Sequence, residues 1–242
     1  MKTIIIGNQE WSTENLNTET FNNGDSIAEI QSFEEWIEAA KQKIPAWCYH
    51  NNDPANAHIY GKLYNWYTVI DSRGISPDGF RVPTKKDIED MIINLTGGVR
   101  RSSEMIREKR VAGKDLKKNI SDWSTPGLSK ARLRDVLKNE KLELEQLEID
   151  NPHFIAELKI GLGFNAVPGG YRMALGYRDF QPIGSAASFW TSTPDDYVYS
   201  EDQIAYGIEL EAYHFGLDYL SGIATGKKAA QGGYSIRLVR NI

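Results

Sequence analysis

The chain has 242 residues, 40% hydrophobic and 25% charged, a composition typical of a globular protein with a sizeable core. Its formal net charge of −5 argues against nucleic acid or an anionic membrane surface as a partner. A single cysteine, Cys48, excludes an intrachain disulfide framework and a cysteine-based zinc cluster. Because Cys48 stands between Trp47 and Tyr49, we expect it to be a small buried hydrophobe.

The N-terminal segment does not have the pattern of a signal peptide. Only three consecutive apolar residues follow Thr3, whereas the apolar region of a secretory signal needs about 7–15. No stretch approaches the roughly 20 apolar residues of a membrane span. The sequence therefore leaves open work in the cytoplasm, a signal-free exit from the cell, or a leader removed beforehand.

The first elements in chain order are a strand and a helix. Residues 3–6 form a β-rich run, and residues 22–25 make a turn signal before the helix. Ser32 is suited to cap a helix over residues 32–43, with Glu35 three positions later and Pro45 ending it. An apolar stripe on this helix consists of Phe33, Trp36, Ile37 and Ala40.

Residues 51–56 are a cluster of Asn, Asp and Pro, and four aromatic residues follow within positions 60–67. Such a segment is either a rigid turn joined to the core or an aromatic-walled recognition surface. If the segment is extended, Tyr64 and Trp66 face one side and Tyr67 the other. We favour Trp66 and Trp190 as core residues.

A second helix is predicted after Pro83. Thr84 caps it, Asp87 follows three residues later, and the pair Gly97 and Gly98 ends it. One face of this helix carries Ile88, Met91, Ile92 and Leu95.

The chain then changes character twice. Lys, Arg and Glu dominate residues 99–160, where helical spacing and balanced charge predict a helical insertion packed on the main domain. Gly, Tyr and Ser dominate from residue 161, where strands are predicted at residues 164–167, 187–193, 205–212 and 234–240. The pattern favours one α+β domain over residues 1–242 with a loop-rich C-terminal half.

Seven short sequence motifs, taken in their order along the chain, resemble those of the Fibrobacter succinogenes major paralogous domain family. They stand at residues 6–16, 51–67, 79–84, 112–117, 163–172, 189–193 and 235–240. That family is similar in motif order to formylglycine-generating-enzyme-like domains, which are variants of the C-type-lectin fold. The resemblance implies two helices that flank small, twisted, mostly antiparallel sheets with long loops. Residues from about 124 to 160 have no counterpart in it.

The resemblance also carries expectations about place and chemistry. Family members are mostly secreted or lipid-anchored proteins of Bacteroidetes-like bacteria, so an extracellular, cell-surface or virion-associated location is favoured. Formylglycine-generating enzymes bind copper through cysteine thiolates in the C-terminal part of the domain. The C-terminal half of this chain has no cysteine, and its scattered histidines lack zinc-site spacing, so we expect no enzyme and no cofactor.

Two sets of candidate site residues follow from the sequence. Asn51, Asp53 and Asn56 offer oxygens to a calcium ion, although Asx-turns that brace the loop are the alternative. The candidate ligand-binding residues are in the C-terminal half: Tyr197, Tyr199, Tyr213, His214 and Tyr219.

These observations favour a non-enzymatic binding or adhesion module that presents loops to a glycan or protein partner. The alternative is a structural or receptor-binding component of a phage tail or contractile injection particle. In that case the segment 99–160 would make assembly contacts, and the protein would form homo-oligomers. Neighbouring tail genes or surface-polysaccharide genes would separate the two hypotheses.

Overall fold

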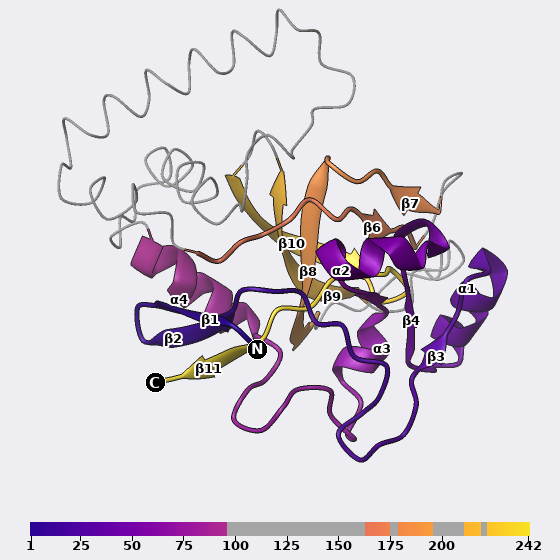
Figure 1. Ribbon diagram of the computed structural model, residues 1–242, viewed down its shortest axis with the longest axis horizontal. Helices are drawn as coiled ribbons and strands as arrows, with labels where there is room; N and C mark the ends of the chain where they lie inside the picture. Colours follow the sequence, from indigo (N-terminus) through magenta and orange to yellow (C-terminus); the bar gives the residue numbers. More distant parts are fainter. Residues whose placement is uncertain (96–162, 175–178, 196–210, 219–221) are drawn as a thin grey trace, which may run out of the picture.

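The computed structural model describes residues 1–95, 163–174, 179–195, 211–218 and 222–242, with backbone alone for 211–227 within these ranges (Figure 1). The described part is mixed α and β, with short helices and small sheets. Within it, no helix has both the length and the apolar character needed to cross a membrane.

The N-terminal part, up to residue 95, contains both longer helices. Its strands are β1 (Thr3–Ile6), β2 (Gln9–Ser12), β3 (Ala28–Glu29), β4 (Ala46–Cys48) and β5 (Leu63–Tyr64). Its helices are α1 (Phe33–Lys41), α2 (Ala57–Tyr60), α3 (Trp66–Val69) and α4 (Lys85–Leu95), with 3-10 turns η1 (His50–Asn52) and η2 (Pro54–Asn56).

The described C-terminal part consists of strands and loops. Its strands are β6 (Tyr171–Arg172), β7 (Phe180–Gln181), β8 (Ala186–Pro194), β9 (Glu211–Asp218), β10 (Gly222–Ala229) and β11 (Val239–Asn241). The sheets run in the orders β1-β2-β11, β10-β9-β8, β3-β4-β5 and β6-β7. Only the β3–β4 pair is parallel among the described strands. In Figure 1, α4 and α1 lie on either side of the β8–β10 sheet.

The C-terminal segment 233–239 joins these sheets. Isolated bridges link Gly233 to Arg172, Tyr234 to Tyr64 and Ser235 to Phe189. Val239 then bridges to Arg81 as β11 begins. One short segment thus contacts four parts of the chain that are far apart in sequence.

The core has two main clusters, and residues of this segment belong to both. One packs α4 against the β1–β2 hairpin and β8 through Trp11, Met91 and Phe189. The other is rich in aromatic residues, including Trp66, Trp190 and Tyr234. Trp190 is fully buried and Trp66 is 3% exposed, which confirms both as core residues. Cys48 is also fully buried, as expected.

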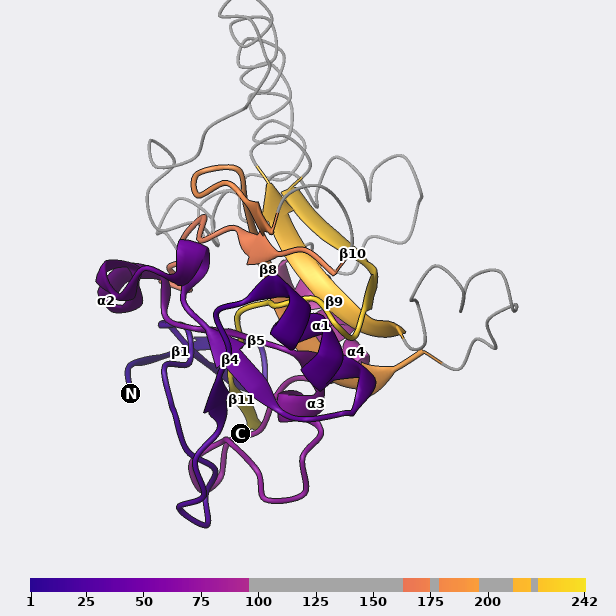
Figure 2. The same ribbon diagram turned by 90° about the vertical axis from the view of Figure 1, so that its right-hand side faces the viewer.

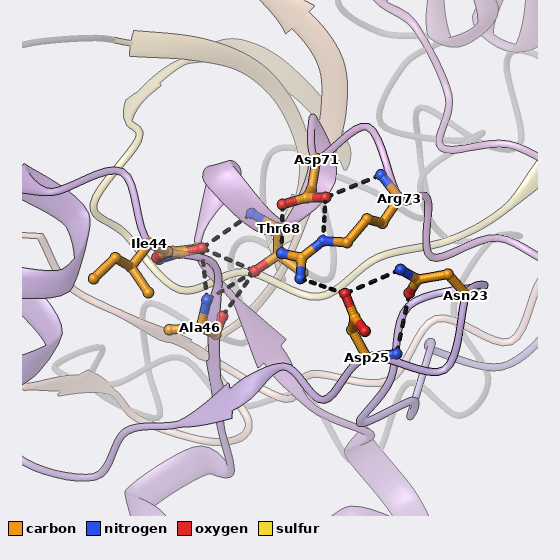
Figure 3. Close-up of polar contacts among 8 residues, drawn as sticks. Asn23, Asp25, Ile44, Ala46, Thr68, Asp71 and Arg73 are labelled. Carbon is orange, nitrogen blue, oxygen red and sulfur yellow. Dashed lines mark hydrogen bonds and ion pairs between the residues drawn. The ribbon is translucent and has the colours of Figure 1, made fainter.

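Asn65 turns the aromatic segment into this core. The side chain of Asn65 is buried; its Oδ1 accepts from the backbone N–H groups of Ala46 and Thr68, and its Nδ2 donates to Ile44 O. Figure 3 shows the hydrogen bonds that surround Ala46 and Thr68. Because Asn65 caps α3, the chain is not extended here, and Tyr64, Trp66 and Tyr67 are all buried. The condition for alternation, an extended segment, is therefore not met.

Both predicted helices are confirmed. Ser32 caps α1 by accepting from the backbone N–H of Glu35 at 3.3 Å. Thr84 and Asp87 exchange bonds at the start of α4, since Thr84 N donates to Asp87 Oδ2 at 2.6 Å and Asp87 N donates to Thr84 Oγ1. The predicted apolar face of α4 is buried.

The strand predictions fare unevenly. The strand at 3–6 is confirmed as β1, and the strand at 187–193 lies within β8. The prediction at 164–167 is wrong, because Asn165 has φ +55° and the segment makes only a bridge at Ala166. Within residues 234–238 only Tyr234 and Ser235 make bridges, so the last strand begins at Val239.

The α+β class with two flanking helices and mostly antiparallel sheets is therefore confirmed in the described part. The predicted insertion at 99–160, the helix end at Gly97 and Gly98, and residues 205–210 of the predicted strand at 205–212 lie outside the described residues. Of that strand, Glu211 and Ala212 lie in β9.

Asp87 is the main polar contact at the base of α4. Its carboxylate accepts from Arg81 Nη2 at 2.7 Å, from Thr84 and from Gln9 Nε2 at 3.2 Å.

We expect Asp87→Asn to lower the free energy of unfolding by about 2 kcal/mol, because charge-assisted bonds and a helix cap weaken together. Urea denaturation measures this loss. Asp90→Asn on the same helix is the control, since the one ion pair of Asp90 with a described residue is with exposed Lys86, and an equal loss there would contradict the prediction.

Candidate functional site

The predicted ligand-binding residues are only partly covered by the structure. Tyr197, Tyr199 and Tyr219 lie outside the described residues. Tyr213 and His214 lie on β9, where the register pairs Tyr213 with Lys227 of β10 and His214 with Trp190 of β8. Recognition by these five residues stays a prediction.

The candidate calcium residues make hydrogen bonds that brace their own loop. Asp53 Oδ1 accepts from Ala55 N at 2.9 Å, and Asn56 Nδ2 donates to His50 O at 2.9 Å. Asn51 has φ +55°, a turn conformation that Asn tolerates. These contacts are those of the Asx-turn alternative. Within the described ranges, no group of three or more His, Cys, Asp or Glu residues is placed to hold a metal ion.

His50 connects this loop to β7. Its imidazole is buried, packs against the ring of Phe180, and has Nε2 2.8 Å from Gln181 O. Because a carbonyl only accepts, Nε2 carries the proton. Burial lowers the pKa of His50 below its ordinary value. His50 therefore has a structural role, joining the loop to β7.

A pocket of about 330 Å³ lies between the N-terminal hairpin, α2 and the segment at 165–167. We call it the N-terminal pocket. Its exposed lining includes Lys2, Glu14, Asn17, His58 and Ile59, and its more buried lining includes Thr13, Asn15, Asn165, Val167 and Arg237. Figure 2 shows β1 and α2 on the same side of the molecule. A second hollow of about 440 Å³ shares Glu14, Asn15 and Asn17 with it.

The wall of the N-terminal pocket is fixed by contacts between residues 15–16 and 60–62. Asn15 Nδ2 donates to Tyr60 O at 2.8 Å, and Lys62 N donates to Leu16 O at 3.3 Å. Gly61 has φ +68°, and a Cβ there would stand 2.8 Å from Leu16 O. Only glycine allows this close approach, so the wall depends on Gly61.

Arg237 lies at the base of the N-terminal pocket and is fully buried. Its Nη1 donates to Ser12 O at 2.9 Å and to Phe164 O at 2.7 Å. Its Nε donates to Asn15 Oδ1 at 2.7 Å, and its Nη2 donates to Asn165 O at 2.9 Å. The guanidinium thereby connects the N-terminal hairpin, the 164–165 segment and the C-terminal segment.

The charge of Arg237 has no carboxylate bonded to it among the described residues. Burial lowers the pKa of Arg237 to about 9, and only Glu14 acts in the opposite direction. The guanidinium is therefore charged at neutral pH. The centre of the Phe164 ring lies 4.7 Å from the guanidinium carbon, and this cation–π contact stabilises the buried charge of Arg237 in part.

Sequence reasoning missed Arg237 and the pocket. In a strand at 234–240, alternation with buried Ile236 and Leu238 would place Arg237 on the solvent side. The segment is instead buried on both faces. The one feature of the sequence that could have indicated a buried Arg237 is its position between two large apolar residues.

The sequence motifs lie within the match to one family model. The model of the Fibrobacter succinogenes major domain matches residues 4–240. The chain belongs to the Fibrobacter succinogenes major domain family. Comparisons with curated proteins and with solved structures find no match. The family name carries no activity, so function is argued from the site alone.

The buried His50 predicts acid sensitivity. The pKa of His50 is depressed in the folded protein, so the unfolded chain takes up the proton first as the pH falls below about 6.5. Stability is then greatest above that pH and declines below it. We expect the urea midpoint of His50→Gln to fall less than that of the wild-type protein as the pH is lowered from about 6.5 to 5. His58→Gln, at an exposed position, should keep the wild-type slope; a wild-type slope in His50→Gln would contradict this role.

Proposed function

We propose that this domain is a non-enzymatic binding module that holds a ligand, most simply part of a glycan, in the N-terminal pocket. The observation that supports it is a preformed hollow whose walls come from four chain segments held by buried and part-buried hydrogen bonds. Binding to such a site does not require a loop to be ordered first, which lowers the cost of association. We extend the proposal to a C-type-lectin-like arrangement, in which loops on a compact scaffold carry recognition.

The chemistry of the lining favours a glycan. Asn15, Asn17, Asn165 and Thr13 place amide and hydroxyl groups along one small pocket. Such groups donate and accept at once, which suits the hydroxyls of a sugar. The volume of about 330 Å³ is at the lower end for ligand sites and suits one or two sugar units.

The protonation state of Cys48, the cysteine that could act as a nucleophile, supports the proposal of binding without catalysis. Burial raises the pKa of the Cys48 thiol to about 12, so this cysteine does not supply a thiolate at neutral pH. His58, which lines the pocket, has no cysteine or serine beside it among the pocket residues. A lone imidazole does not make a catalytic triad.

A glycan microarray tests the proposal. We expect the wild-type domain to bind a subset of glycans and Ala57→Trp to reduce that binding at least about tenfold, because an indole at this position fills the pocket. Ala55→Trp is the matched control: it lies two residues away, is exposed and does not line the pocket.

The same array separates the two candidate surfaces. Loss of binding in Tyr213→Ala with full binding in Ala57→Trp would overturn the pocket in favour of the C-terminal loops. The absence of any glycan signal from the wild-type domain would contradict the glycan proposal and leave a protein partner.

A further inference from the structure

The N-terminal pocket has a positive charge at its base to which no carboxylate of the described residues is bonded. A guanidinium has five N–H groups, and the bonds that Arg237 makes to described residues use four, all to uncharged oxygens. One hydrogen on Nη2 is left over. A buried cation without a carboxylate favours an anion at the nearest point that solvent reaches. That point is the pocket above Arg237.

Lys2 adds a second positive charge at the rim. Its Nζ is 3.6 Å from Glu14 Oε1, but both side chains are largely exposed, at 83% and 63%. Ion pairs of this kind contribute little and exchange readily with water or ligand. Lys2 is therefore free to turn toward a bound anion, whereas Glu14 opposes one.

We propose that the N-terminal pocket binds a sugar that bears a carboxylate, as in uronic or sialic acid units of a glycan. The carboxylate pairs with Lys2 in the field of Arg237, and the sugar hydroxyls bond to the side chains of Asn17 and Asn165 in the lining. This inference rests on the proposed function and adds the ligand class. An acidic protein segment is less favoured, because Ala57, Ile59 and Val167 are the only apolar side chains in the lining and protein interfaces need larger apolar or aromatic anchors.

The test compares matched pairs in which one member bears a carboxylate and the other an uncharged group in its place. The probes are oligogalacturonates and their methyl esters, and sialylated oligosaccharides and their carboxyl-reduced forms, titrated into the full chain at pH 7. We expect the acidic member of one pair to bind at least about tenfold more tightly and the difference to shrink at high salt. An aspartate-rich peptide serves as the protein-derived carboxylate.

Variants at the rim assign the effect to this pocket. Lys2→Gln should weaken binding of the acidic probe about fivefold, and Glu14→Gln should strengthen it by a similar factor, as expected for a single charge at contact distance near water. Lys43→Gln removes the same charge from an exposed position outside the pocket and should change nothing. Neither pocket variant removes a bond from Arg237, so folding is preserved.

The outcomes separate this inference from the proposed function. Equal affinity for both members of every pair, still lost in Ala57→Trp, would overturn the carboxylate and leave the binding module intact. Weaker binding in Glu14→Gln would also overturn it. Binding of the peptide without any glycan would refute the acidic sugar, and no binding of any probe would refute the proposed function with it.

Discussion

The fold depends on how Arg237 satisfies backbone groups in a core that has few long strands. The C-terminal segment makes single bridges, and Arg237 bonds the carbonyl groups of Ser12, at the end of β2, and of Phe164 and Asn165. Unbonded buried carbonyls would each destabilise the folded state. The N–H groups of the Arg237 guanidinium thus take the place of a neighbouring strand as donors to these carbonyls. The arrangement requires that a charge be buried.

Arg172 has a similar role elsewhere in the core. It is fully buried, and its Nη1 and Nη2 donate to Ile30 O and Gln31 O at 2.8 Å each. Its guanidinium carbon lies 4.6 Å from the centre of the Trp36 ring, which joins it to α1. The two arginines explain how loops that are far apart in sequence keep a defined arrangement.

The elements that could be predicted are those whose causes are local. The caps at Ser32 and Thr84 and the apolar stripes behind them define α1 and α4, and β-branched residues define β1. The failures at 164–167 and 234–238 share a different cause. Their backbone groups bond to a distant side chain or make single bridges, and a pattern within the segment does not contain that information. The pocket was missed for the same reason, since its lining comes from four segments that only the folded chain brings together.

The bonds that stabilise the core also shape the N-terminal pocket. Asn15 accepts from Arg237 with Oδ1 and donates to Tyr60 O with Nδ2, so one amide couples the buried cation to the pocket wall. Because both amide groups are engaged, the wall cannot move without breaking a buried bond. A ligand bound in this pocket, as we propose, would meet a rigid surface, and its affinity would depend on matching the polar groups and the charge already in place. A site of this kind tolerates changes at exposed rim residues such as Lys2 and Glu14, which makes the rim the part of the pocket where specificity can vary without loss of the fold.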